Sequence, residues 1–285
     1  MILSFHPCFT ADAQVILGAR DPGPEELRMI HDADAIILPQ GCSRNLYRLC
    51  RDSGAFLFPS YDMRFRHPGK IGQSRLFRRL GLPHPETLCW KDVAAYRGAF
   101  PGADTYPHGL PFLLKEDLSH EAEGVFLVEG ASSLATALHR LAAREKSGMP
   151  GFVTQRLVPA GGNALRVVVI GEETVSYWKR PAVPGQVITT ISRNAAIDHA
   201  WRPELQEKGR RLAGILMQKT GINLAAVDFV FPLSDMDPGP LFLEVNYFFG
   251  RRGLGGIERY YRLLHRAVRH WLIRKGLDPD RIALA

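Results

Sequence analysis

The residues best suited to chemistry lie near the end of the chain, in a run that is otherwise apolar. The run Leu241–Phe249 contains two polar side chains, Glu244 and Asn246, which stand two positions apart. Because successive strand side chains alternate between faces, these two point the same way. A carboxylate on a buried face costs free energy unless it meets a cation or hydrogen-bond donors. The strand therefore predicts a cation or donor groups on that face.

A second apolar run, Ala225–Phe231, contains a single acid, Asp228. The connection between the two runs, residues 232–240, is rich in Pro, Asp and Gly, as is typical of a turn. We therefore expect a hairpin that brings Asp228 alongside Glu244 and Asn246. Three oxygen-bearing side chains suit a hard cation such as Mg²⁺, which proteins often hold together with nucleotide phosphates. The alternative is a structural network in which each acid pairs with an arginine.

Two lysines add positive charge at the expected ends of other elements. Lys115 ends the apolar run Pro111–Lys115, and Lys70 begins a basic helix expected over Ile71–Leu80. A lysine in such a place can bind phosphate as a point charge. Taken alone, however, a lysine in either place is more often an ordinary solvated surface residue.

The first 68 residues are expected to form a small α/β unit. Strands are expected at Met1–Phe5, Ala35–Pro39 and Ala55–Phe58, and helices begin at Pro24 and Arg44. Strands that alternate with helices favour a parallel sheet. No GxGxxG motif follows the first strand, so a dinucleotide-binding fingerprint is not supported.

The rest of the chain is expected to contain longer elements of both kinds. Helices are expected at Ile71–Leu80, from Ser132 or Ser133 to Lys146, at Arg202–Thr220 and at Tyr260–Lys275. Strands are expected at Leu110–Lys115, Val125–Glu129, Phe152–Val158, Leu165–Ile170 and Thr174–Lys179, besides the two acidic runs. The pattern predicts an α/β (α+β) protein.

Composition and charge exclude several classes of protein. Hydrophobic residues make up 46% and charged residues 23% of 285 residues, as in globular proteins. We see neither a signal peptide at the start nor a run of the roughly 18 apolar residues that a membrane span needs. The four cysteines form no CxxC pair, so we expect reduced thiols in a cytoplasmic enzyme. The net charge of +7 favours anionic ligands, but no nucleic-acid-binding signature appears.

Taken in order, these pieces resemble the ATP-grasp superfamily over about residues 68–260. The resemblance is nearest to the glutamate ligases that modify ribosomal protein, with glutathione synthetase and D-alanine–D-alanine ligase as wider relatives. The matching motifs are Lys70 with Gly81–Thr87, Pro111–Lys115 with Gly124–Val125, Gln155–Val158, Leu165–Gly171, Lys179–Arg180, Val227–Asp228 and Leu243–Asn246. The ordered series is more specific than any single motif.

This resemblance implies an ATP-grasp fold of two α/β subdomains that grip ATP, preceded by a small Rossmann-like domain. Residues 1–68 would form that N-terminal domain and residues 69–285 the ATP-grasp domain. About residues 106–157 would form a lid-like subdomain within it.

The resemblance also implies roles for individual residues. ATP phosphates would contact Lys70 and Lys115, and the adenine edge would be read by the backbone of a hinge, Gln155, Arg156, Leu157 and Val158. Mg²⁺, with Mn²⁺ as an alternative ion, would be held by Asp228, Glu244 and Asn246. The phosphoryl group and the carboxylate substrate would face Arg166, Arg180 and Arg193.

The implied activity is that of an ATP-dependent carboxylate–amine ligase. In such a ligase a carboxylate attacks the γ-phosphate of ATP, and an amine then displaces phosphate from the acyl phosphate. The protein supplies mostly positioning and electrostatics, so no enzyme nucleophile is required. Its partners would be a small-molecule or peptide carboxylate and an amine, and a homo-oligomer is compatible with this picture.

The sequence departs from the family pattern in four places. The loop Glu116–Gly124 keeps only its last glycine and contains four acids, where the family usually has a glycine-rich loop over the phosphates. Arg156 and Ala164 stand where acids are expected. A bulky, basic segment, Tyr247–Gly253, follows Asn246 and is expected to line the acceptor site. The altered loop leaves an alternative function open, that of a catalytically weak or regulatory nucleotide-binding protein.

Overall fold

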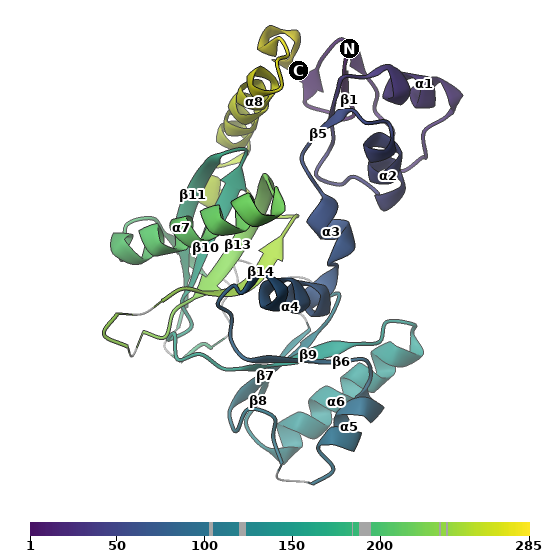
Figure 1. Ribbon diagram of the computed structural model, residues 1–285. Helices are drawn as coiled ribbons and strands as arrows, with labels where there is room; N and C mark the ends of the chain where they lie inside the picture. The colour runs from purple at the N-terminus through teal and green to yellow at the C-terminus, as the bar shows by residue number, and fades with distance from the viewer. Residues whose placement is uncertain (103–104, 120–123, 184, 188–194, 234, 238) are drawn as a thin grey trace.

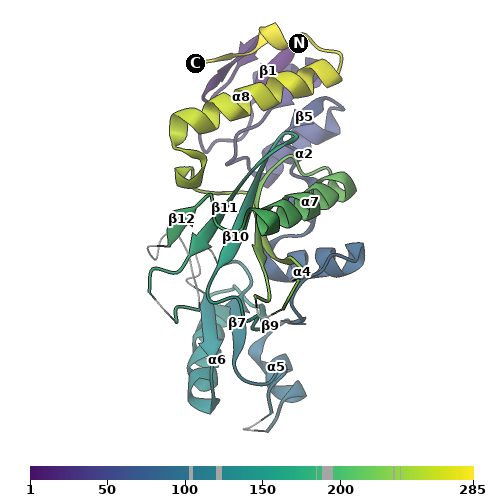
Figure 2. The same ribbon diagram turned by 90° about the vertical axis from the view of Figure 1, so that its left-hand side faces the viewer.

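The computed structural model describes residues 1–102, 105–119, 124–183, 185–187, 195–233, 235–237 and 239–285 (Figure 1). Three larger sheets follow one another along the molecule. The N-terminal sheet lies at one end, an antiparallel central sheet in the middle and a smaller antiparallel sheet at the other end (Figure 2). The α/β prediction is confirmed.

The N-terminal domain is a parallel sheet with strand order β3-β1-β4-β5, as predicted from the alternation of strands and helices. Its strands are β1 (Ile2–Ser4), β3 (Ala13–Gln14), β4 (Ala35–Ile37) and β5 (Phe56–Phe58), and its helices are α1 (Pro24–Asp32) and α2 (Arg44–Asp52). The Ser43 hydroxyl caps α2 by accepting a hydrogen bond from Leu46 N at 3.1 Å.

The central sheet has the order β12-β11-β10-β13-β14, and each neighbouring pair is antiparallel. Its strands are β10 (Ala164–Ile170), β11 (Glu173–Arg180), β12 (Ala196–Asp198), β13 (Leu224–Val230) and β14 (Leu241–Asn246). Two long helices, α7 (Pro203–Thr220) and α8 (Ile257–Arg274), pack against it. Every residue of β13 is buried, which places this strand at the centre of the fold.

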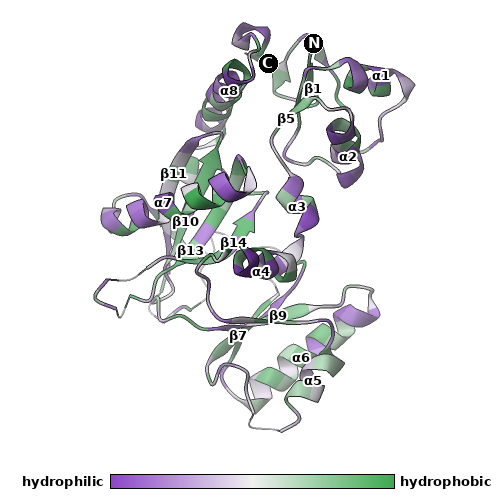
Figure 3. Cartoon of the chain, viewed as in Figure 1, coloured by the Kyte–Doolittle hydropathy of each residue, from purple (hydrophilic) through white to green (hydrophobic). Residues whose placement is uncertain are grey.

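The two faces of the central sheet are covered differently. On β10, Leu165, Val167 and Val169 share a hydrophobic cluster with α7, whereas Val168 and Ile170 share one with α8. This alternation follows from the two-residue period of a strand. Figure 3 shows the largely hydrophobic colouring of the central strands beside the mixed colouring of the helices.

The third sheet has the order β6-β9-β7-β8. It is built from β6 (Thr87–Trp90), β7 (Phe112–Glu116), β8 (Val125–Val128) and β9 (Phe152–Arg156), with α5 (Val93–Ala99) and α6 (Ala131–Lys146) packed on one face. Because β6 and α5 belong to this unit, it begins about twenty residues before the boundary of 106 that the resemblance implied. Its apolar cluster is separate from those of the central sheet.

Two short helices connect the N-terminal domain to the rest of the chain, and α4 lies between the central and third sheets (Figure 1). They are α3 (Asp62–Arg66) and α4 (Gly69–Leu80). Helix α4 ends at Gly81, whose φ of 64° is the left-handed conformation that glycine adopts without a steric penalty.

The end of the chain returns to the N-terminal domain. Helix α8 shares a hydrophobic cluster with Ile2, Phe9, Ile37 and Phe58. Strand β15 (Ala283–Leu284) pairs with β2 (Phe9–Thr10), and the short 3₁₀ helices η2 (Arg252–Leu254) and η3 (Pro279–Arg281) flank α8. The expected division into residues 1–68 and 69–285 therefore does not separate two independent cores. None of the helices in the described ranges is long and apolar enough to cross a membrane.

Candidate active site

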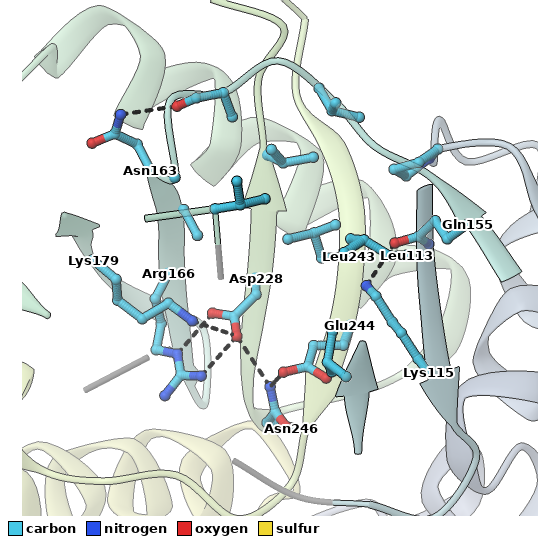
Figure 4. A pocket seen from close by; sticks show the side chains of 18 of the residues that line it. Leu113, Lys115, Gln155, Asn163, Arg166, Lys179, Asp228, Leu243, Glu244 and Asn246 are labelled. Atoms are coloured by element: carbon cyan, nitrogen blue, oxygen red, sulfur yellow. Dashed lines mark hydrogen bonds and ion pairs between the residues drawn. The ribbon is translucent and has the colours of Figure 1, made fainter. Parts of the chain in front are cut away.

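A cavity of about 820 Å³ lies between the central sheet, the third sheet and α4. Most of the predicted site residues line it: Lys70, Lys115, Gln155, Arg156, Leu157, Val158, Arg166, Asp228, Glu244 and Asn246. Figure 4 labels Lys115, Gln155, Arg166, Asp228, Glu244 and Asn246 among them, and their side chains converge from strands of two different sheets. The structure thus brings together residues that are up to 176 positions apart, from Lys70 to Asn246.

The predicted hairpin between β13 and β14 is confirmed. Asp228 lies opposite Glu244, and Ala226 lies opposite Asn246, so the three polar side chains share one face. The register shifts between Asp228 and Phe229, which is the signature of a β-bulge. Bulges are common beside active sites, where they redirect side chains.

Asp228 is the most enclosed of the polar groups, with 1% of its surface exposed. Its Oδ1 accepts a hydrogen bond from Arg166 Nε at 2.8 Å, and its Oδ2 accepts from Arg166 Nη2 at 2.7 Å. Lys179 Nζ donates to Oδ2 at 2.9 Å (Figure 4). Burial alone would raise the pKa of Asp228, but the charges of Arg166 and Lys179 outweigh it and hold the pKa well below its usual range. The carboxylate is therefore ionised, and two cations already neutralise it.

Glu244 and Asn246 are half-buried and touch each other. Asn246 Nδ2 donates to Glu244 Oε1 at 2.9 Å and to Asp228 Oδ2 at 3.2 Å. Among the described residues, none donates a hydrogen bond to Glu244 Oε2 or Asn246 Oδ1. These two oxygens lie at the cavity wall and are the kind of ligand that Mg²⁺ prefers.

The oxygen donors at this wall fit a magnesium ion that is shared with phosphates. Within the described part of the chain, no cluster of three or more His, Cys, Asp or Glu side chains could enclose a metal ion. Mg²⁺ is typically bound by one or two carboxylates plus substrate phosphates rather than by a full protein cage. Glu244 and Asn246 match that pattern. Asp228 has its oxygens committed to Arg166 and Lys179, so it would contribute negative charge near the ion rather than a direct bond to it.

Both predicted lysines reach the cavity and are partly desolvated. Lys115 Nζ donates to Gln155 Oε1 at 2.6 Å, and burial lowers its pKa to about 8 against the opposing effect of Glu244. Lys70 Nζ donates to the Ser119 carbonyl at 2.9 Å and to its hydroxyl at 3.1 Å, and burial lowers its pKa as well. Desolvated ammonium groups of this kind interact more strongly with phosphate than solvated ones do.

The acid-rich loop places its first two acids away from the cavity. The Glu116 carboxylate is buried and pairs with Arg144 of α6 at 2.9 Å. Asp117 Oδ1 accepts a hydrogen bond from Ile71 N at 2.7 Å and so caps the first turn of α4. Glu121 and Glu123 lie outside the described residues.

The segment 155–158, expected to be the hinge, lines the cavity where β9 ends. Arg156, which stands where the family usually has an acid, directs its side chain to Glu86, with Nε 3.0 Å from Oε2. Its backbone amide donates to the Glu86 carbonyl at 2.9 Å. The substitution is therefore accommodated by a partner on the neighbouring strand segment.

Of the three arginines predicted to face the phosphoryl group, Arg166 lines the cavity and Arg180 does not. Arg180 Nη1 pairs with Asp198 Oδ2 at 2.9 Å, and its guanidinium carbon lies 4.6 Å from the Trp201 ring centroid. Arg193 lies outside the described residues.

Lys179 is a cavity residue that the sequence interpretation missed. Arg166 lies opposite Tyr177 on β11, and Lys179 is two residues further along the same strand. The two-residue period therefore places Lys179 on the face of Arg166 and Asp228, and sends Arg180 to the other face. This alternation is the signal that could have favoured Lys179 over its neighbour.

The segment after Asn246 also reaches the cavity. Phe248, Phe249, Arg251 and Arg252 are among the residues that line it. Tyr247 instead is buried, and its carbonyl accepts a hydrogen bond from Gln40 Nε2 of the N-terminal domain at 2.9 Å.

Comparison with known proteins agrees with this geometry. The RimK-like ATP-grasp domain matches residues 77–263. A protein from Hahella chejuensis named "Probable alpha-L-glutamate ligase 2" is 28% identical over 266 residues, which cover 90% of this chain and 79% of that protein.

Solved structures show the same fold. A RimK domain ATP-grasp protein from Sphaerobacter thermophilus has a TM-score of 0.58 at 16% identity, with 92% of this chain and 97% of that chain covered. A D-alanine–D-alanine ligase from Bacillus anthracis has a TM-score of 0.62 at 12% identity, with 93% and 86% covered. The chain therefore belongs to the RimK-like ATP-grasp family. This membership confirms the predicted class of activity, an ATP-dependent carboxylate–amine ligase.

Proposed function

Starting from this chain's membership of the RimK-like ATP-grasp family, we propose that its cavity binds magnesium-ATP and activates a carboxylate with the residues that line it. One observation carries the proposal: a single cavity gathers two desolvated lysines, a strand-end hinge and the surface formed by Asp228, Glu244 and Asn246.

The proposed position of the nucleotide follows from the residues that line this cavity. The adenine would lie against the backbone of residues 155–158, and the phosphates would lie between Lys70 and Lys115. In support, the two lysines come from different elements, α4 and β7, yet each shares the cavity with Glu244. Phosphate oxygens would replace Ser119 and Gln155 as acceptors for the two ammonium groups.

Magnesium, or manganese in its place, would bind Glu244 and Asn246 beside Asp228. When bound, the ion would neutralise charge on the phosphates. The support is chemical: two oxygens at the cavity wall lack protein donors among the described residues, and both belong to a strand fixed by the β13–β14 register.

In the proposed reaction, a carboxylate oxygen of the acid attacks the γ-phosphorus and the bond to the departing ADP oxygen breaks, which gives an acyl phosphate. The amine nitrogen then attacks the acyl carbon and loses a proton to solvent, while phosphate leaves with the electrons of the broken C–O bond. Arg166 and Lys179 would stabilise the charge on the transferred phosphoryl group. A guanidinium has five N–H donors, so the two bonds from Arg166 to Asp228 leave others available.

We further propose that one of the two substrates is acidic, with glutamate, free or within a peptide, as the first candidate. Arg251 and Arg252 line the cavity, and no carboxylate among the described residues forms an ion pair with either. Arginine recognises carboxylates by paired hydrogen bonds. The name of the Hahella chejuensis relative points to the same amino acid.

A cytoplasmic location and small-molecule or peptide substrates, rather than nucleic acid, are part of this proposal. The four cysteines are free thiols in the structure, as a reducing compartment would keep them. A homo-oligomer is compatible with the fold, and gel filtration of the purified protein would establish the assembly.

The proposal is tested by measuring ADP release from magnesium-ATP in the presence of each amino acid and of glutamate-containing peptides. We expect release that depends on both an acid and an amine, with an acidic substrate preferred. Absence of any ATP binding would contradict the proposal. Binding without turnover under all pairs of substrates would favour the catalytically weak or regulatory alternative.

A further inference from the structure

The strand that carries Glu244 and Asn246 lies at the edge of the central sheet. Strand β14 pairs with β13 on one side, and no other strand of the described residues pairs with it on the other side. Val245 stands between the two polar residues, and its buried side chain belongs to the hydrophobic cluster on the α7 face. In an antiparallel sheet the backbone groups of successive residues point to opposite edges. The N–H and C=O of Val245 therefore need a partner at the open edge of the sheet.

A side chain of α4 supplies that partner. Gln73 Oε1 accepts a hydrogen bond from Val245 N at 2.8 Å, and Gln73 Nε2 donates to Val245 O at 2.9 Å. One amide side chain thus satisfies both backbone groups of one strand residue, as a neighbouring strand would. Both atoms belong to a part-buried contact between residues 172 positions apart.

The same helix carries Lys70. Lys70 and Gln73 are three residues apart on α4, so their side chains lie on one side of the helix. Both residues line a small cavity of about 20 Å³ together with Lys115 and Glu244. One turn of α4 therefore contacts the strand of the proposed metal ligands through Gln73 and points Lys70 toward the proposed phosphate position.

We propose that Gln73 is a positioning residue that fixes the direction of Glu244 and Asn246 and their distance from Lys70. The inference rests on the proposed function, because it assigns to Gln73 the alignment of the proposed metal ligands. Without the Gln73 amide, the Val245 N–H and C=O would be unpaired at the sheet edge, and the strand could shift or twist to find other partners. Glu244 and Asn246, on either side of Val245, would move with it.

The decisive variant is Gln73→Met, which keeps the length of the side chain and removes both hydrogen bonds. Groups that orient metal ligands typically contribute about 10- to 100-fold to metal affinity. We therefore expect Gln73→Met to weaken Mn²⁺ binding about tenfold or more, measured by electron paramagnetic resonance of free Mn²⁺ in the presence of a non-hydrolysable ATP analogue. Gln73→Ala should weaken it to a similar extent.

Two controls separate alignment of the metal ligands from general damage. Arg75 lies on the same helix, is exposed and has no ion pair with a described residue, so Arg75→Ala should bind Mn²⁺ like the original protein. Affinity for the nucleotide analogue in the presence of EDTA should be unchanged in Gln73→Met, because Lys70 and Lys115 do not need the metal.

Each outcome decides between the proposals. Equal Mn²⁺ affinity in Gln73→Met and the original protein would overturn the role of Gln73 and leave the proposed function standing. A parallel loss of metal-free nucleotide binding would show that Gln73 only supports the fold, which also overturns it. If the original protein bound neither nucleotide nor Mn²⁺, the proposed function itself would fail, and this inference with it.

Discussion

One face of the central sheet has two halves that differ sharply in chemistry. Beneath α8 this face presents Val168, Ile170 and Leu224, which are buried in a hydrophobic cluster. Further along the same strands, beyond the paired residues Val168 and Ala226, it presents Arg166 and Asp228, which line the cavity. Both halves belong to the same antiparallel strands, with a β-bulge beside Asp228 in the charged half, and they differ in what covers the face. In the half that α8 covers, the side chains are apolar and pack against the helix. In the half that lines the cavity, the charged side chains of Arg166 and Asp228 pair with each other.

The charged half does not destabilise the sheet, because its charged side chains have partners. A buried carboxylate without partners would lose several kilocalories per mole of solvation. Asp228 avoids that loss through its bonds with Arg166 and Lys179, and Glu244 accepts a hydrogen bond from Asn246 at the cavity wall. The apolar half contributes stability, and the charged half lines the cavity in which we propose that phosphate and a metal ion bind.

Of the changes proposed to either half, removal of the Asp228 charge should lower the free energy of unfolding most. Asp228→Asn leaves Arg166 and Lys179 as neighbouring buried cations, so we expect a loss of about 3–5 kcal/mol in the free energy of unfolding, measured by urea denaturation. ADP formation should be lost as well. Asp198→Asn, which breaks the more exposed pair with Arg180, should leave the unfolding midpoint almost unchanged, because water screens an exposed ion pair. Equal unfolding midpoints for Asp228→Asn and the original protein would mean that the charged half is not held by this carboxylate.

Glu244→Ala should separate catalysis from stability. Glu244 is half-buried at the cavity wall, so its removal should leave the urea unfolding curve nearly unchanged. A metal ion contributes several kilocalories per mole to such transition states, which corresponds to a loss of roughly 100-fold or more in magnesium-dependent ADP formation. Retention of full activity would show that the assignment of Glu244 to the metal is wrong.

The pH dependence of nucleotide binding should report on Lys115. With its pKa lowered to about 8, the amine is charged below that pH and becomes neutral above it, whereas an ordinary lysine stays charged to about pH 10. Affinity for ATP should therefore be highest below pH 8 and fall by up to about tenfold per unit above it, as calorimetric titration at several pH values would show. Lys115→Arg, whose guanidinium stays charged, should remove this fall. A profile that is flat to pH 10 in the original protein would contradict the lowered pKa.

The smallest effect is expected in the apolar half. Ile170→Val removes one methyl group from a fully buried position and should cost about 0.5–1.5 kcal/mol of stability. The magnesium requirement and the affinity for ATP should not change, because Ile170 is absent from the cavity wall. A change in either would show that the two halves of the face are coupled through the strand.

Local patterns in the sequence were enough to predict much of this site. The β13–β14 pairing followed from two strand-like runs and a turn, and it fixed which face Asp228, Glu244 and Asn246 share. The predicted helices at 71–80 and 202–220 agree with α4 and α7 to within two residues. These features depend on neighbours in sequence, where periodicity and turn residues are informative.

Contacts between distant segments could not be predicted in the same way. Whether Lys179 or Arg180 faces the cavity depends on the register of β11 against β10, which the sequence interpretation did not use. Gln73 gives no signal in an amphipathic helix, since its role depends on the backbone of a strand 172 residues away. The return of α8 to the N-terminal domain likewise depends on packing between the two ends of the chain.

That return has a mechanical consequence. Because α8 shares one hydrophobic cluster with strands of both the N-terminal domain and the central sheet, these two parts pack as one unit. The third sheet has a cluster of its own and is joined to the central sheet through the stretches on either side of it, residues 81–86 and 157–163. Domains with separate cores and slender connections move relative to one another by default. By this default, we expect the third sheet, with Lys115 and residues 155–158, to move relative to Arg166, Asp228 and Glu244 of the central sheet.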